Sequence, residues 1–275
     1  MAKGEWDRAI ADYDIAIAFD ASAVAYYNRG LARERKGDPD GALSDYNITI
    51  KLNPRRADAY LNRGNILYGQ GQYRAAISDF SRAIEINPRN AGAWGIRCAA
   101  LYRQGALDAA VADCGRALRL DARNADAWNS RGLARQEKGE LDGALADFDR
   151  AITLVPQQAA FYSNRGGAWL LKNQPERALN DLNRALRLDS KLAGAWNNRG
   201  IAHLGMSDFA QAMADFDEAL KINPRMADAY CSRGVAWLAL GELEDAEADI
   251  SRCRKLGGSP KPEAERLLRL RKQAH

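Results

Sequence analysis

Side chains that commonly carry catalysis are scarce in this sequence. It contains two histidines, His203 and His275, and neither has a carboxylate or thiol partner at a recurring spacing. No cluster of histidine and cysteine has metal-ligand spacing, and no glycine-rich phosphate loop follows a strand pattern. We therefore predict that the protein is not an enzyme and that it holds neither a metal nor another cofactor. His203 is expected to fill space in the core.

The four cysteines form no CxxC pair. Three of them, Cys98, Cys114 and Cys253, stand where corresponding parts of the sequence have glycine, an aromatic residue and alanine. These are packing positions, so we predict buried thiols in the reduced state. Reduced thiols favour a cytoplasmic location.

Charged side chains offer a different chemistry, because an arginine and an aspartate recur every 34 residues. The arginines are Arg29, Arg63, Arg97, Arg131, Arg165, Arg199 and Arg233. The aspartates are Asp45, Asp79, Asp113, Asp147, Asp181, Asp215 and Asp249. Both fall on stripes that face neighbouring helices, where an unpaired charge is costly and a guanidinium and a carboxylate satisfy one another. We predict structural ion pairs, either within each repeat or across each junction between repeats.

The same period organises the small and apolar residues. An aromatic residue lies three positions before each arginine, as Trp128 does, and a small residue follows it, as Gly132 does. Alanines such as Ala144 come later in each copy, and prolines such as Pro156 close several of them. This pattern resembles the tetratricopeptide repeat family. The resemblance implies an all-α fold, an α-solenoid that winds as a right-handed superhelix of helix-turn-helix repeats.

Three parts of this solenoid are expected. Residues 5–18 match the second half of a repeat and predict an N-terminal half repeat with the second helix only. Residues 23–260 hold seven repeats, and residues 262–273 predict a C-terminal capping helix, because terminal repeats need a polar outer face. An opening within a repeat is typical of a fragment, so whether a signal or another domain precedes it stays open.

The overall charge limits the classes of partner. The net charge is +4 at pH 7, which is small for 275 residues and implies no strong field for nucleic acid or membrane. No apolar run approaches the ~20 residues that span a bilayer. We therefore expect a protein or peptide partner, with no nucleic acid and no membrane.

The position just before each arginine predicts a binding surface. It holds Asn28, Asn62, Ile96, Ser130, Asn164, Asn198 and Ser232. An asparagine side chain offers a donor and an acceptor, which matches a peptide group. The placement is similar to the asparagine ladder in the repeats of the O-linked N-acetylglucosamine transferase, and this resemblance implies that the amides hold the backbone of an extended peptide. The alternative is that they are solvated or bond to the adjacent helix.

Other residues complete this expected groove. The predicted side-chain contacts are Tyr68, Tyr102, Leu170, Leu204 and Leu238. The groove positions of the first helices hold no lysine or arginine, so we expect no grip on a C-terminal carboxylate. Asp58, Asp126 and Asp228 instead favour a basic or neutral segment.

These patterns together predict a non-catalytic protein-interaction scaffold that binds an extended peptide segment of a partner in a concave groove. Two alternatives stay open. The chain is a self-assembling scaffold, forming a homo-oligomer through its exposed N-terminal half repeat, or it is the substrate-recognition arm of a larger enzyme.

Overall fold

The computed structural model describes the backbone of residues 3–273 and the side chains of residues 5–271, and every regular element in this range is an α-helix. The chain divides after Lys138 into two compact units. The first unit contains α1 (Lys3–Phe19), α2 (Ala23–Lys36), α3 (Pro39–Leu52), α4 (Ala57–Gly69), α5 (Tyr73–Ile86), α6 (Ala91–Arg103), α7 (Leu107–Leu120) and α8 (Ala125–Glu137). The second unit contains α9 (Leu141–Leu154), α10 (Ala159–Leu171), α11 (Pro175–Leu188), α12 (Ala193–Gly205), α13 (Phe209–Ile222), α14 (Ala227–Leu240), α15 (Leu243–Lys255) and α16 (Pro262–Gln273). The predicted all-α solenoid repeats are confirmed.

Each repeat turns between its two helices at a residue in the left-handed conformation. Gly37 has a φ of 88° and Gly241 a φ of 91°, which glycine adopts without steric penalty. Asn173 and Ser207 take the same conformation in two repeats, with φ values of 55° and 61°. The sequence therefore sets both the place and the hand of these turns, as predicted.

Within a repeat, the small residue after the arginine lets the two helices approach closely. A Cβ atom at Gly64 would lie 2.6 Å from Cε1 of Phe80, and one at Gly200 would lie 2.6 Å from Cε1 of Phe216. Both phenylalanine side chains are fully buried. A small residue and an apolar residue 16 positions later thus form the contact that pairs the helices of a repeat.

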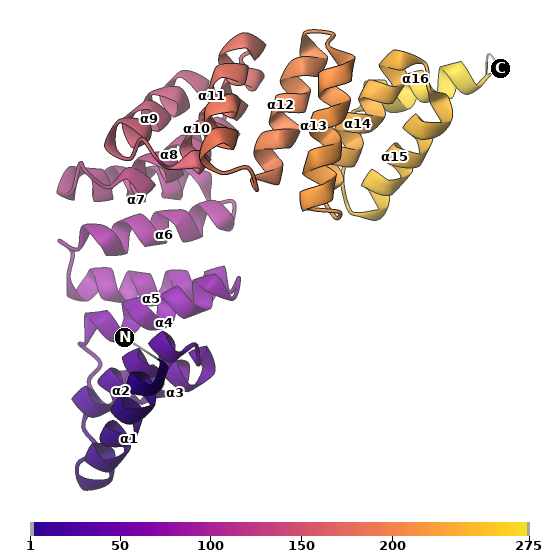
Figure 1. Ribbon diagram of the computed structural model, residues 1–275. Helices are drawn as coiled ribbons and strands as arrows, with labels where there is room; N and C mark the ends of the chain where they lie inside the picture. Colours follow the sequence, from indigo (N-terminus) through magenta and orange to yellow (C-terminus); the bar gives the residue numbers. More distant parts are fainter. Residues whose placement is uncertain (1–2, 274–275) are drawn as a thin grey trace. The chain divides into compact units, whose positions relative to one another are not determined.

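The helices at the two ends differ from the rest of the array. The expected half repeat lies in α1, which packs against α2 and leaves Ile15 and Phe19 exposed at 59% and 89%. The expected capping helix is α16, which packs against α14 and α15 in the second unit (Figure 1). Its Ala264 and Leu268 join the buried cluster around Ile250.

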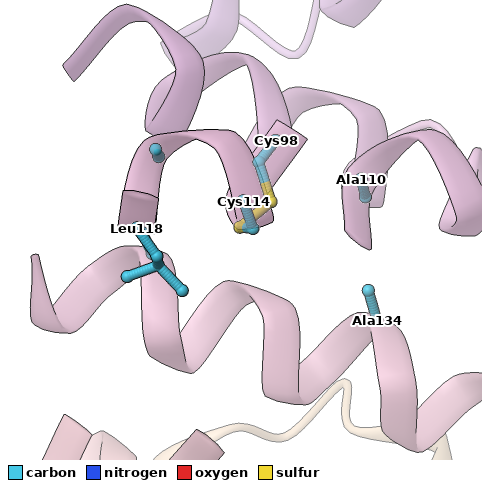
Figure 2. Close-up of a cluster of buried hydrophobic side chains, with 7 residues drawn as sticks. Cys98, Ala110, Cys114, Leu118 and Ala134 are labelled. Carbon is cyan, nitrogen blue, oxygen red and sulfur yellow. A yellow bond between two sulfur atoms is a disulfide. The ribbon is translucent and has the colours of Figure 1, made fainter. Parts of the chain in front are cut away.

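The cysteines are joined in two disulfides, so the expectation of reduced thiols is wrong. Cys98 and Cys114 lie 5.3 Å apart at their Cα atoms, as do Cys231 and Cys253. Figure 2 shows the first bond beside the buried side chain of Leu118. Cys98 takes the small position of α6 and Cys114 the aromatic position of α7, and these positions touch in other repeats. The argument for a cytoplasmic location, which rested on reduced thiols, falls with that expectation.

Candidate functional site

Recurrent arginines lie between two second helices. In Arg63, Nε and Nη2 donate to the carboxylate of Asp79 at 2.8 and 2.6 Å, and Nη1 donates to Oδ1 of Asn47 at 2.6 Å. Asp79 belongs to the same repeat, whereas Asn47 lies on α3 of the preceding one. The arginines with this double contact, each followed by its own and its preceding partner, are Arg29 (Asp45, Asp14), Arg97 (Asp113, Ser81), Arg165 (Asp181, Asp149), Arg199 (Asp215, Asn183) and Arg233 (Asp249, Asp217). Both forms of pairing considered from the sequence therefore occur together. Arg131 and Asp147 belong to different units.

These ion pairs are buried and lie away from ligand access. Asp45 and Asp215 are exposed by 0% and 1%. Hydrogen bonding to the aspartates raises the pKa of Arg29, Arg165 and Arg233, and outweighs the opposing effect of desolvation. The geometry is that of a structural ladder along the array.

The predicted asparagines have unlike surroundings. In the first unit, Nδ2 of Asn62 donates to the hydroxyl of Tyr27 at 3.1 Å, so this amide bonds to the adjacent first helix. The Tyr27 ring also lies 3.9 Å from the guanidinium carbon of Arg56. Burial raises the pKa of Tyr27, and the nearby Asp58 adds to that shift. Tyr27 is a residue at this surface that sequence reasoning missed.

The other ladder positions divide between two pockets and the helix surface. Asn28 is half-buried on α2, and Asn164 is half-buried on α10. Asn198 lines a pocket in the second unit. Ile96 and Ser130, which interrupt the ladder, line a pocket in the first unit.

The pocket in the first unit has a volume of about 480 Å³ and lies among α4, α6 and α8. Its lining residues are Asn65, Tyr68, Gly92, Gly95, Ile96, Ala99, Asn124, Asp126, Ala127 and Ser130. The predicted contact Tyr68 is among them. The hydroxyl of Tyr102 instead donates to Oε1 of Glu137 at 2.7 Å, and burial, followed by this hydrogen bond, raises the pKa of Tyr102 to about 12.

A second pocket, of about 330 Å³, lies in the second unit, and we call it the C-terminal pocket. It is lined by Asn197, Asn198, Ile201 and Leu204 of α12, by Asp228, Cys231, Ser232 and Val235 of α14, and by Ser259 and Lys261 of the segment before α16. It contains the predicted Asn198 and Leu204. Sequence reasoning missed Lys261, because this residue lies beyond the last repeat and the period assigns it no place.

Asn197 is the polar residue most enclosed in the C-terminal pocket. The residue is 4% exposed, and its Oδ1 atom is buried without a hydrogen-bond partner among the described residues. A buried acceptor in this state carries a desolvation penalty of ~1–3 kcal/mol. The pocket thus combines an unsatisfied acceptor with apolar side chains.

Two of the predicted leucines lie in the packing between helices. Leu238 is 1% exposed and belongs to a cluster with Ile250 and Leu268, so its prediction as a groove contact is wrong. Helix α16 covers this position, as a following first helix would. Leu170 is half-buried and packs against the cluster that contains Leu182.

His203 lies beside carboxylates on the packing side of α12. Its Nδ1 is 3.5 Å from Oδ2 of Asp208, and its Nε2 is 4.0 Å from Oδ2 of Asp215. The other histidine, His275, lies outside the described residues. Within residues 3–273, no group of three or more histidine, cysteine or acidic residues is placed to hold a metal ion. In the same range, no helix combines the length and apolarity that a bilayer crossing requires.

Comparisons with known proteins place this geometry in context. The sequence matches descriptions of the tetratricopeptide repeat at residues 1–54, 57–90, 99–139, 129–193 and 193–226. A search among curated proteins found no match.

Solved structures share the fold. The structure of the APC/C hetero-tetramer Cut9-Hcn1 aligns with a TM-score of 0.76 and 17% identity over 97% of this chain and 52% of that one, so this chain spans about half its length. A tetratricopeptide repeat protein from Parabacteroides merdae ATCC 43184 aligns with a TM-score of 0.72 and 20% identity, over 92% and 99% of the two chains. A TPR protein described as having an unusual peptide-binding site, YrrB, has a TM-score of 0.51 and 23% identity over 70% and 97%.

Proposed function

Because this chain belongs to the tetratricopeptide repeat family, whose members are generally non-catalytic scaffolds for protein interaction, we propose that it binds an extended peptide segment of a partner protein along its first helices. The observation that carries the proposal is the C-terminal pocket. It opens between two consecutive first helices, α12 and α14, and holds both apolar and amide side chains. The likeness to YrrB, described as having a peptide-binding site, supports the same kind of partner.

The chemistry of the C-terminal pocket suits a peptide. Ile201, Leu204 and Val235 are half-buried and give an apolar wall for a partner side chain. Asn198 offers a donor and an acceptor, which together match one peptide group. A pocket of about 330 Å³ lies at the small end of the ligand-site range, so it takes a few side chains.

The remaining predicted residues extend the proposal along the array. In the first unit, Tyr68 lines a pocket together with Asp126 and Ser130, and this pocket takes a second part of the bound segment. Asn28, with Asn164 of the second unit, supplies further backbone contacts in this proposal. Asn62 contributes through the amide hydrogen and carbonyl that its bond to Tyr27 leaves available.

A peptide array tests the proposal. We expect the full chain to bind a subset of extended peptides, and Asn198→Ala to weaken the best of them by about 3- to 10-fold, as the loss of one or two hydrogen bonds predicts. Fluorescence anisotropy measures the affinity. The matched control is Asn180→Ala, which changes an exposed asparagine on the second helix α11. Equal affinities for the Asn198 variant and the unchanged protein, or an array without binders, would refute the proposal.

A second candidate function is self-association through α1, and the exposure of Phe19 and Ile15 favours it. These two side chains lie on one helix and would bury apolar surface against another copy. Sedimentation velocity over a range of concentrations tests this. A mass that rises with concentration, and that Phe19→Ser returns to that of a monomer, supports self-association; a constant monomer mass excludes it.

A further inference from the structure

We propose that the C-terminal pocket selects a basic side chain, lysine or arginine, in the bound segment. This inference rests on the proposed function and names the residue class that the pocket recognises. Its basis is the pocket lining itself, which places acceptors beside an apolar wall.

Two acceptors in the pocket lack donors. Oδ1 of Asn197 is buried and unsatisfied, so an N–H group from a ligand would recover the desolvation penalty of that atom. Asp228 lies in the first turn of α14 and forms no ion pair or side-chain hydrogen bond with any described residue. A lysine or arginine head group carries several donors and a positive charge, and satisfies both acceptors.

The apolar wall suits the aliphatic part of such a side chain. Long basic side chains lay their methylene groups along apolar surface while the charged end reaches a polar partner. Ile201, Leu204 and Val235 supply that surface. An acidic side chain would have to approach the unsatisfied carbonyl oxygen of Asn197, which repels it.

Lys261 opposes a bound cation, and its position limits that effect. It is exposed and precedes α16 in an irregular segment, whereas Asp228 is fixed on a helix. The long lysine side chain can turn toward solvent, where its charge is screened. Removing the charge of Lys261 should therefore strengthen the binding of a basic ligand.

The test compares three versions of one array peptide, with lysine, norleucine or glutamate at the residue that enters the pocket. Norleucine keeps the aliphatic part of lysine and lacks its charge. We expect the lysine peptide to bind about tenfold more tightly than the norleucine peptide, as a charge-assisted hydrogen bond predicts, and the glutamate peptide to bind most weakly. Fluorescence anisotropy gives the three affinities.

Variants of the protein assign the preference to this pocket. Asp228→Asn should abolish the difference between lysine and norleucine peptides, and Lys261→Gln should increase it. Asp245→Asn, an exposed acidic residue on α15 outside the pocket, is the matched control and should change nothing. Equal binding of the lysine and norleucine peptides, or a preference for glutamate, overturns the inference. Failure to bind any peptide refutes the proposed function instead.

The Cys231–Cys253 disulfide carries a second, independent proposal: we infer that its redox state sets the affinity of the C-terminal pocket. Cys231 lines the pocket, and Cys253 is fully buried behind it. A Cβ atom at Gly258 would lie 2.6 Å from Sγ of Cys253, so the backbone there rests directly on the disulfide. The next residues of this segment include Ser259 and Lys261, which complete the pocket.

Reduction changes the volume beneath that segment. A dithiol reductant supplies two electrons and two protons, the S–S bond breaks, two cysteine thiols form, and the reductant becomes a disulfide. Two thiols cannot stay at bonding distance, so they separate and displace the close-packed segment at Gly258. The lining that Ser259 and Lys261 provide then loses its fixed place.

The affinity of the array peptide before and after reduction tests this proposal. We expect reduction to weaken binding about fivefold, as the loss of one polar contact predicts, and Cys231→Ser/Cys253→Ser to bind like the reduced protein. The control is Cys98→Ser/Cys114→Ser, which removes a disulfide that lines neither pocket and should keep the response to reductant. Unchanged affinity of the reduced protein, with four free thiols counted, overturns the proposal.

Discussion

The change Asp181→Ala isolates one step of the buried ion-pair ladder. Asp181 is 3% exposed and accepts hydrogen bonds from Nε and Nη2 of Arg165 at 2.7 and 2.6 Å. The same guanidinium donates from Nη1 to Oδ1 of Asp149 at 2.5 Å, and the side chain of Asp149 is 60% exposed. Alanine at position 181 therefore leaves Arg165 with its solvated partner and without its buried one.

The expected loss of stability follows from this geometry. Removing one partner of a buried pair typically costs ~3–5 kcal/mol. The side chain of Arg165 is 21% exposed and keeps Asp149, so we expect the lower end, ~3 kcal/mol. Asp149→Ala, which removes the exposed partner, should cost only ~0.2–1 kcal/mol. Replacing both buried partners by apolar residues, as in Arg165→Met with Asp181→Leu, should cost much less than Asp181→Ala alone.

Urea unfolding and native-state hydrogen exchange measure these differences. Exchange resolves the amides of α10 and α11, which is necessary because an array of repeats need not unfold in one step. We expect protection in these helices to fall strongly in Asp181→Ala and little in Asp149→Ala. Equal losses in the two variants would refute the reasoning, since they would show that Asp181 is no more important than a solvated carboxylate.

Three further predictions concern packing, cross-linking and pH. Gly64→Ala should cost ~1–3 kcal/mol because its Cβ meets a buried ring, whereas Gly69→Ala, which meets nothing, should gain ~0.5–1 kcal/mol; urea midpoints that shift alike in the two variants would contradict this. Loss of the Cys98–Cys114 disulfide should cost ~3 kcal/mol through the entropy of the unfolded chain, which urea unfolding of Cys98→Ala/Cys114→Ala measures, and an unshifted midpoint would contradict it. The pKa of Tyr102 is raised to about 12, above its unfolded value of ~10, so its contribution to stability is complete below pH ~10 and is lost as pH rises through ~12. In Tyr102→Phe the alkaline loss of stability should be smaller, and an unaltered pH profile would contradict this prediction.

The sequence was sufficient to predict the fold because each structural requirement repeats. Gly64 and Phe80 touch in one repeat and Gly200 and Phe216 in another, so the period reports the same contact several times. The left-handed turn at Gly37 is specified in the same way. A local pattern seen once would carry much less information.

The site was predicted only in part, because the period describes what repeats and the site depends on what does not. Asn198 and Leu204 line the C-terminal pocket as expected, whereas Lys261 comes from a segment outside the repeats. Leu238 was assigned to the groove because the period does not show that a further helix covers it.

The disulfide Cys98–Cys114 left a signal that was not used. Its two cysteines stand at the small and aromatic positions, 16 residues apart, which are in contact in the other repeats. Cysteines that replace two touching residues lie within bonding distance. The pair Cys231 and Cys253 has no such precedent, since their separation of 22 residues matches no repeated contact.

The arginine ladder has a consequence for how such an array can change its length. Arg63, Arg97 and Arg199 each bind an aspartate 16 residues ahead and a polar side chain 16 residues behind. Excising one whole period brings each arginine next to a polar residue of the same kind as the one it lost. Copies can thus be duplicated or dropped in whole units without stranding a charge, whereas a shift of a single residue unpairs the arginine at that junction.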